Sequence, residues 1–284
     1  MMEIVNSIEL LQDAYKNHYA VGAFNVSDME NIQSVLEAAE ELQSPVLIQG
    51  AQEEVEYADG ECFVEMVKAI AKHKKGVIGI HLDHCRNFDF EVKCIRYGFS
   101  SIMFDGSLLS FQDNIAMTRK VVDIAHAAGV SVEGELGTIG QTTEFGEHIE
   151  DRGLTDPEDA AEFVTETGVD FLATSFGTAH GLYKAEPKLD FERLQKIAEL
   201  TNIPLVMHGG TGVPEKQIKQ AIGLGISKIN FSTILRKSFI DRLKTYLNEH
   251  PDDLMTMNII GEASKAMKQS VKDMMSMCDS VGRL

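Results

Sequence analysis

The chain has 284 residues, 44% of them hydrophobic, and 44 acidic against 26 basic residues give a formal net charge of −18. This composition excludes a disordered or fibrous chain, and the length suffices for one large α/β domain over residues 1–284. The negative charge argues against broad nucleic-acid binding, which needs a basic surface, so an anionic substrate would have to be held by local positive potential.

The N-terminal segment, residues 1–17, has the pattern of an amphipathic helix and lacks the basic region and apolar block of a signal peptide. The four cysteines show no CxxC spacing, and no apolar run approaches the roughly 20 residues that a membrane-spanning helix needs. We therefore expect a protein of the reducing cytoplasm that binds neither membrane nor nucleic acid.

Short β-rich runs alternate with amphipathic helical stretches along the whole chain, which is typical of a parallel sheet built from βαβ units. Residues 157–168 form one such stretch, and Thr155-Asp156-Pro157 marks its start. Eight units in this length favour a TIM (β/α)8 barrel over an open sheet. The expected strands lie at residues 19–26, 44–50, 76–83, 100–106, 130–137, 169–177, 203–209 and 227–232.

Two segments depart from this alternation. Residues 137–153 form a long glycine- and acid-rich loop after the fifth strand, and such loops are usually lids or disordered. The Met-rich tail from Asp252 predicts an additional C-terminal amphipathic helix that packs across the barrel or against a partner subunit.

Three histidines stand where a strand pattern ends: His84 in IGIHLDHC, His180 in TSFGTAHGLYK and His208 in PLVMHGGTG. TIM-barrel active sites lie at the carboxyl ends of the strands, where rigid strands can hold imidazoles around one ion. A single histidine there is more often a core or surface residue, but three at equivalent depth favour catalytic zinc with an open coordination position. Histidines in helix or loop contexts are interpreted as surface residues: His18, His73, His126, His148 and His250.

Carboxylates accompany these histidines at the strand ends. Asp83 precedes His84 and is either a general acid or base facing a substrate hydroxyl, or a helix cap. Asp105 and Glu135 either accept hydrogen bonds from a metal-bound imidazole, hold a metal in an alternative position, or pair with basic neighbours. Cys85 adjoins His84, but neighbouring strand residues point to opposite faces, so we expect a buried, inert thiol.

Glycine- and hydroxyl-bearing turns precede the helices that follow the last two strands. Backbone N–H groups at a helix N-terminus bind phosphate, and the loops after strands seven and eight are the usual phosphate site of this barrel. The candidate phosphate-binding residues are Gly209, Gly210, Thr211, Ser232 and Thr233, with Gly181, Lys184 and Arg236 as candidates to complete the site.

Five motifs follow one another along the chain in a characteristic order and spacing: HLDH, VEGELGTIG, GTAHGLYK, PLVMHGGTG and SKINFST. On these motifs the chain resembles the class II, zinc-dependent ketose-bisphosphate aldolases, which act on fructose 1,6-bisphosphate or tagatose 1,6-bisphosphate. The likeness runs from YAVGAFNV to the C-terminal helix.

The resemblance implies a lyase in which the three histidines bind catalytic zinc and Asp83 moves the proton of the substrate C4 hydroxyl. It implies a secondary divalent-metal site at Asp105 and Glu135, a monovalent cation such as Na⁺ or K⁺ near the phosphate, and a homodimer or homotetramer. The residues implied to contact the substrate are Asn25, Gly181, Gly209, Gly210, Thr211, Asn230, Ser232 and Thr233.

The long loop would close over the site and bring an acid to the carbon-bound proton. We assign this acid to Glu144, with Glu147 as the alternative, because Gly140 is followed by Gln141-Thr142-Thr143 where the family often has glycine and then an acid. Gly50-Ala51-Gln52 lacks the serine that many fructose-bisphosphate enzymes have after the second strand, and Ser232 replaces the Asp, Asn or Ala common after the eighth. The substrate therefore stays open among fructose 1,6-bisphosphate, tagatose 1,6-bisphosphate and a related phosphorylated keto-sugar acid.

Two other readings compete with metal catalysis. Schiff-base aldol chemistry needs a desolvated lysine inside the barrel, and Lys228 on the eighth strand is the candidate. A barrel that binds sugar phosphate as a sensor without turnover is the non-enzyme alternative, because fold alone does not prove chemistry. Neither accounts for the three histidines as well as zinc does.

Overall fold

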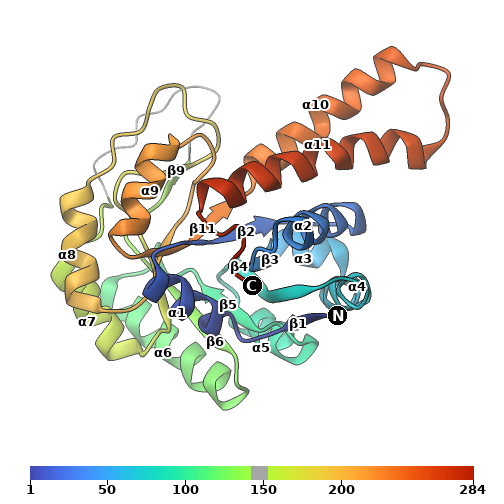
Figure 1. The fold of residues 1–284 in the computed structure, drawn as a ribbon. Coiled ribbons are helices and arrows are strands. Elements are labelled where there is room, and N and C mark those ends of the chain that lie inside the picture. Colours follow the sequence, from blue (N-terminus) through green and yellow to red (C-terminus); the bar gives the residue numbers. More distant parts are fainter. Residues whose placement is uncertain (142–152) are drawn as a thin grey trace.

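The computed structural model describes residues 1–141 and 153–284, and its centre is a closed barrel of parallel strands (Figure 1). The barrel strands are β2 (Val21–Asn25), β3 (Val46–Ala51), β4 (Gly76–Cys85), β5 (Ser101–Phe104), β6 (Ser131–Leu136), β8 (Phe171–Thr174), β10 (Leu205–Met207) and β11 (Ile226–Phe231). Each pairs in parallel with the next along the chain, and β11 closes the barrel by pairing with β2. The predicted TIM barrel is confirmed, and all eight strands fall where the sequence placed them.

Helices surround the barrel and pack their apolar faces on the outward-pointing strand residues. Asp156 begins one of them as predicted: its Oδ1 accepts a hydrogen bond from the Glu158 N–H at 2.9 Å, with Pro157 in the first turn. These helices are α2 (Met29–Leu42), α3 (Gln52–Ala58), α4 (Gly60–Ala71), α5 (Phe88–Tyr97), α6 (Phe111–Ala127), α7 (Pro157–Thr167), α8 (Phe191–Thr201) and α9 (Glu215–Gly223).

The N-terminal segment differs from the single helix expected for residues 1–17. A short strand, β1 (Met2–Ile4), pairs with β4, and only then does α1 (Ser7–Asn17) begin, capped by the Asn6 side chain. Helix α1 lies across the amino-terminal end of the barrel (Figure 1), where Leu10 and Leu11 join the inward-facing Val206 in an apolar cluster. This end of the barrel is closed, so the opposite end is left for a site.

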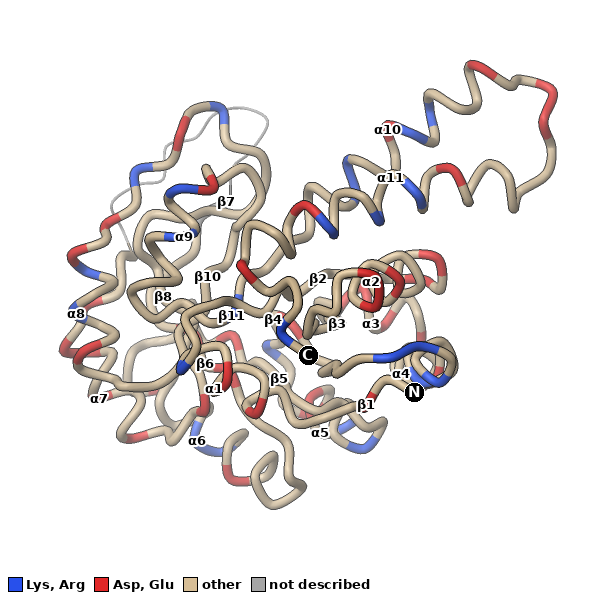
Figure 2. The backbone as a smooth tube through the Cα atoms, in the orientation of Figure 1, with Lys and Arg blue, Asp and Glu red and all other residues tan. Residues whose placement is uncertain are grey.

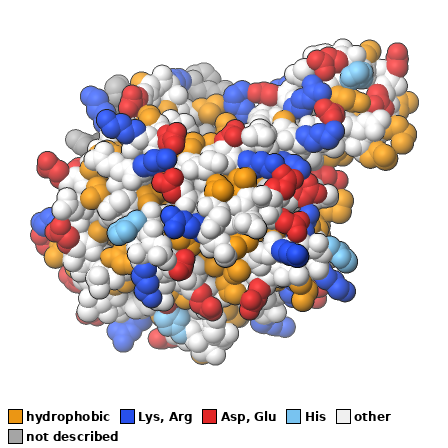
Figure 3. Space-filling model, viewed as in Figure 1, with side chains coloured by type: hydrophobic (Ala, Val, Ile, Leu, Met, Phe, Trp, Pro, Cys, Tyr) orange, Lys and Arg blue, Asp and Glu red, His pale blue; other side chains and the backbone are white. Residues whose placement is uncertain are grey.

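The additional C-terminal helix is also present. α10 (Thr233–Glu249) and α11 (Thr256–Met277) form an antiparallel hairpin that projects from the barrel, and we call it the arm (Figure 1). The second half of α11 buries Met267, Val271 and Met275 against the barrel helices, while the far end of the arm exposes apolar side chains (Figure 3). The exposed residues at this end are Leu254, Met255 and Met257.

Charged residues lie mainly on the outer helices and the arm, and the barrel strands are largely free of them (Figure 2). None of the helices in the described ranges has the length and apolar character needed to span a bilayer. The few charges that the strands do carry are therefore the ones to examine.

Candidate active site

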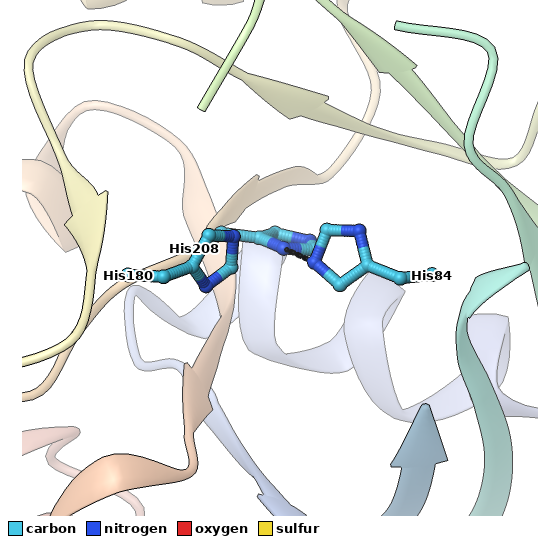
Figure 4. Close-up of side chains that lie close together, drawn as sticks. All are labelled: His84, His180 and His208. Atoms are coloured by element: carbon cyan, nitrogen blue, oxygen red, sulfur yellow. Dashed lines mark hydrogen bonds between the residues drawn. The ribbon is translucent and has the colours of Figure 1, made fainter. Parts of the chain in front are cut away.

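Three imidazoles converge at the open end of the barrel (Figure 4). The ring centroid of His84 lies 5.0 Å from that of His180 and 4.6 Å from that of His208. One nitrogen from each ring lies within 4.8 Å of the other two, a spacing that a metal ion could bridge. The structure thus brings together three residues separated by up to 124 positions in the chain.

His84 reaches this point through an irregularity in β4. In a regular strand Asp83 and His84 would point to opposite faces, but the pairing with β5 shifts register between Leu82 and Cys85, and His84 has φ of +42°. This left-handed conformation costs roughly 1 kcal/mol. It turns His84 toward the barrel mouth beside Asp83 and sends Cys85 into the core under the helices, as expected for an inert thiol, where its Sγ contacts the Asn87 carbonyl oxygen.

His180 comes from a connection and not from a barrel strand. It belongs to β9 (Ala179–His180), which pairs with β7 (Gly140–Gln141) in a separate two-stranded sheet. Gly209 permits this approach: its φ is +69°, and a Cβ there would lie 2.2 Å from the Ala179 carbonyl oxygen. The glycine therefore holds the His180 segment close to the loop that carries His208.

Asp83 is 4% exposed and is held by two asparagines. Its Oδ2 accepts a hydrogen bond from Asn25 Nδ2 at 3.0 Å, and its Oδ1 accepts one from Asn230 Nδ2 at 3.1 Å. Burial alone would raise its pKa, but the neighbouring imidazoles, His84 foremost, hold the pKa of this carboxyl well below its usual value. The cap of α5 is Asn87, so the helix-cap alternative for Asp83 is wrong.

Asp105 and Glu135 lie on the other side of His84, 3.5 Å and 3.6 Å from its Nδ1. Asp105 is fully engaged: Oδ2 accepts from Arg86 Nη2 at 2.6 Å and Oδ1 from Ser107 Oγ at 2.6 Å. Oε2 of Glu135 has no hydrogen-bond partner among the described residues, and burial raises the pKa of this carboxyl to about 8. With His84 they form a second group that could hold a cation.

A cavity of about 830 Å³ opens above these residues. One wall is the predicted phosphate site, where the loops after β10 and β11 meet and the Ile234 N–H donates to Thr211 Oγ1 at 3.4 Å. The N-cap residue of α10, Ser232, makes no capping hydrogen bond with its own side chain, and the first turn holds no acid, so the remaining N–H groups suit an anion. The lining includes Asn25, Asp83, His84, His180, Gly181, Gly209, Thr211, Asn230, Ser232, Thr233 and Arg236.

Other predicted residues lie elsewhere. Gly210 is buried, and a Cβ there would meet Ile229 Cγ2 at 2.6 Å, so its absent side chain serves packing. Lys184 is exposed and is not among the described residues that line the cavity. Glu144 and Glu147 fall in residues 142–152, outside the described ranges.

The donor set fits a divalent metal. Burial lowers the pKa of His180 to about 3 and also lowers the pKa of His208, so both imidazoles are neutral donors. Burial opposes protonation of His84 too, but Asp83 and two further carboxylates raise its pKa to about 9, so a positive charge is favoured there. Neutral imidazoles beside a place that favours a cation suit zinc.

Comparison with known proteins decides the family. Residues 5–283 match the model of the family described as Fructose-bisphosphate aldolase class-II. The chain belongs to this family. This class II aldolase is therefore a lyase, and the resemblance drawn from its motifs is confirmed.

This class II aldolase is 41% identical over 273 residues to the sulfofructosephosphate aldolase of Alkalicoccus urumqiensis, with 96% of this chain and 95% of the relative covered. It is 33% identical to the YdjI aldolase from Escherichia coli K12, a crystal structure matched with a TM-score of 0.87 over 99% of both chains. Fructose-bisphosphate aldolase from Campylobacter jejuni matches with a TM-score of 0.84 at 23% identity, over 100% of this chain and 97% of that one, which shows the fold alone.

Sequence reasoning singled out Lys228, as a Schiff-base candidate, but overlooked His81, Glu133 and the polar layer that the three form directly below the histidines of the aldolase. His81, Glu133 and Lys228 are all 0% exposed and point into the barrel. Each stands two positions before a residue that faces the site: Asp83, Glu135 and Asn230 respectively. Because alternate strand residues share a face, a period of two along β4, β6 and β11 was the signal that could have found them.

Proposed function

We propose that this aldolase uses zinc to cleave a ketose 1,6-bisphosphate reversibly, with fructose 1,6-bisphosphate giving dihydroxyacetone phosphate and glyceraldehyde 3-phosphate. His84, His180 and His208 would hold the zinc. The observation that supports this is the convergence of one nitrogen from each imidazole within 4.8 Å at the base of the cavity. The carboxylate of Asp83 lies in the same cavity wall.

When bound, zinc supplies Lewis-acid stabilisation of the negative charge that develops as the substrate C3–C4 bond breaks. Asp83 accepts the C4 hydroxyl proton during cleavage and returns it in the reverse reaction. Its depressed pKa keeps it ionised and ready to accept a proton. Asn25 and Asn230 fix the orientation of both carboxylate oxygens, which prevents the base from turning away from the hydroxyl.

The N-terminus of α10 and the loop after β10 would bind the C1 phosphate through Gly181, Gly209, Thr211 and the 232–233 turn. Two arginines line the cavity, Arg86 paired with Asp105 and Arg236 paired with Glu54, each at 2.6 Å, and they would bind an anionic group of the substrate by exchanging these carboxylates for it. Gly210 and Lys184 would act indirectly, through loop packing and long-range charge. Glu144 remains our predicted acid for the carbon-bound proton, with Glu147 as the alternative.

Further cations form part of the proposal. Oε2 of Glu135, which has no hydrogen-bond partner among the described residues and lies 3.6 Å from His84 Nδ1, supports a secondary divalent site with His84 and Asp105, although Asp105 would first have to release Arg86. A monovalent cation, Na⁺ or K⁺, near the phosphate follows from the family resemblance.

A second substrate has a specific observation in its favour. The relative with 41% identity is named for a sulfonated fructose phosphate, and residues 50–52 lack the serine that many fructose-bisphosphate enzymes have after the second strand. A sulfonate in place of the 6-phosphate keeps an anion at the distal end with less charge. Tagatose 1,6-bisphosphate, the C4 stereoisomer, is the remaining alternative.

A substrate panel tests the proposal. The zinc-loaded protein is assayed for dihydroxyacetone phosphate release from fructose 1,6-bisphosphate, tagatose 1,6-bisphosphate, the 6-sulfonated fructose 1-phosphate and fructose 1-phosphate, and each assay is repeated after chelation. We expect release from a ketose that carries an anionic group at both C1 and C6, with no activity after chelation and recovery on adding zinc. Full activity after metal removal, together with loss on borohydride treatment in the presence of substrate, would contradict zinc catalysis.

The working protein is proposed to be a cytoplasmic homodimer or homotetramer built from one domain, residues 1–284. Support for the assembly comes from the end of the arm, where Leu254 and Met257 are 87% and 72% exposed. Such apolar side chains gathered at a projection suit contact with a second copy.

A further inference from the structure

Below the histidines, the carboxylate of Glu133 joins three side chains from different strands. Its Oε1 accepts a hydrogen bond from His208 Nε2 at 2.8 Å. Its Oε2 accepts one from Lys228 Nζ at 2.8 Å and lies 3.3 Å from His81 Nε2. All four residues are 0% exposed, so water does not compete for these contacts.

The contact with Glu133 determines which nitrogen of His208 can face the other imidazoles. A neutral imidazole carries one N–H, and the acceptor at Nε2 places the proton there. Nδ1 then keeps its lone pair, and it lies 2.9 Å from Nε2 of His84 (Figure 4). The ring therefore presents a donor atom to the centre of the site before any ion arrives.

Glu133 is itself held in place from below and from the side. His81 is fixed through Nδ1, 2.7 Å from Ser101 Oγ, which in turn lies 2.6 Å from Ser7 Oγ at the closed end of the barrel. Lys228 extends from β11 into the same layer and is ion-paired with Glu133. An amine that is paired and buried in this way is not available as a Schiff-base nucleophile.

We propose that Glu133, anchored by Lys228, is a positioning residue that sets the tautomer and ring orientation of His208 for metal binding. Lys228 is the buried counter-ion that this carboxylate requires. The inference rests on the proposed zinc site and deepens it. Outer carboxylates of this kind contribute about 10–100-fold to metal affinity when they orient a ligand.

The competing explanation is an ion pair that only fills the core. Replacing such a pair by apolar residues of similar volume is often neutral or stabilising, so stability alone cannot separate the two. Two double variants can: Glu133→Leu with Lys228→Met, and Glu133→Gln with Lys228→Met. Both remove the ion pair, but only the glutamine variant keeps an acceptor for His208.

Zinc affinity is measured by competition with a chromophoric chelator, and the cobalt-substituted proteins are compared by their visible d–d absorption. The leucine variant is expected to bind zinc about 10–100-fold more weakly and to show an altered cobalt spectrum, while the glutamine variant stays within roughly threefold of wild type. Wild-type affinity in both variants would overturn the proposal. Equal weakening in both would also overturn it, because the acceptor would then not be the cause.

A measurement on the wild-type chain covers the case in which a variant does not fold. Nitrogen-15 NMR of the histidine rings in the zinc-loaded protein is expected to show the Nε2–H tautomer for His208. The Nδ1–H tautomer would contradict the inference. Failure of the wild type to bind zinc at all would instead overturn the proposed function, so the two failures are distinguishable.

Discussion

Glu133 and Glu91 are both buried carboxyls, 0% and 1% exposed, and their surroundings are opposite. Burial would raise the pKa of both, but Lys228, followed by His208 and His81, holds the pKa of Glu133 well below its usual value. Glu91, in α5 between the barrel and the helices, has no hydrogen-bond partner for either oxygen among the described residues, and burial raises its pKa to about 9.

The comparison separates two regions of the molecule. Inside the barrel, near its open end, facing strands supply partners to the ionised Glu133 and Asp83, and His208 contacts this polar layer. Between strands and helices the packing is apolar, and an isolated carboxyl there is neutral. Burial of an acid therefore does not mark a site, whereas its partners do. Changes inside the barrel should alter chemistry, and changes outside should alter stability.

The largest effect is expected from His208→Ala. Loss of one of three imidazoles should abolish stoichiometric zinc and reduce turnover by more than roughly 10⁴-fold, because charge stabilisation in the reaction is lost. Metal analysis and dihydroxyacetone phosphate release measure both. His73→Ala, an exposed histidine at the end of α4, is the matched control and should match wild type. A fully active His208→Ala protein would refute the ligand role.

Asp83→Asn should retain zinc and lower kcat by about 10²–10⁴-fold with a smaller change in KM, the range for loss of a general base. The amide of the variant has a single oxygen, so it could accept a hydrogen bond from either Asn25 or Asn230 there, while its NH₂ group would face the other asparagine. Steady-state kinetics on the metal-loaded variant measure this, with the exposed Asp123→Asn as control. If kcat were unchanged, another group would have to move the C4 hydroxyl proton.

The barrel could be predicted from sequence because it depends on repeated local signals. Eight β-rich runs alternate with helical periodicity, and each run became a strand. The position of Asp83 at the mouth, and of the loops after β10 and β11 beside it, follows from the rule that TIM-barrel sites lie at strand ends. Helix α1 was only partly predicted, because Met2–Ile4 pair with β4, and strand pairing depends on distant residues.

The remainder depended on three-dimensional contacts. The positive φ of His84 comes from the bulge against β5, which no motif encodes. Pairing of β9 with β7 brings His180 to the site from outside the barrel wall, although the sequence suggested a strand end. Glu133 lies within the motif VEGELGTIG, but its contacts with His208 and Lys228 form only when β4, β6 and β11 face each other across the interior.

Outside the barrel, Phe63→Ala should reduce the free energy of unfolding by about 3–5 kcal/mol, because a fully buried ring is replaced by a cavity. Phe63 stacks on Phe99 with ring centroids 5.7 Å apart, in the layer under α4. Urea unfolding measures the loss, and zinc content per folded molecule should stay at the wild-type value. Phe63→Leu, which retains most of the side-chain volume, should reduce the free energy of unfolding clearly less. A loss of zinc in either variant would contradict the expectation that changes outside the barrel alter stability and not chemistry.

The smallest effect, and the one specific to pH, is expected from Glu91→Gln. A carboxyl whose folded-state pKa is raised from 4.5 to about 9 keeps its proton when folded and releases it when unfolded, so the wild type loses stability as pH rises through this interval. Glutamine does not titrate. The unfolding free energy of the variant relative to wild type should therefore rise by about 1 kcal/mol per pH unit between pH 5 and 8. Urea unfolding at several pH values measures the slope, and Glu166→Gln, an exposed residue of α7, should run parallel to wild type. If the unfolding free energies of Glu91→Gln and wild type changed with pH by the same amount, the Glu91 carboxyl would have a partner after all, and the contrast with Glu133 would fail.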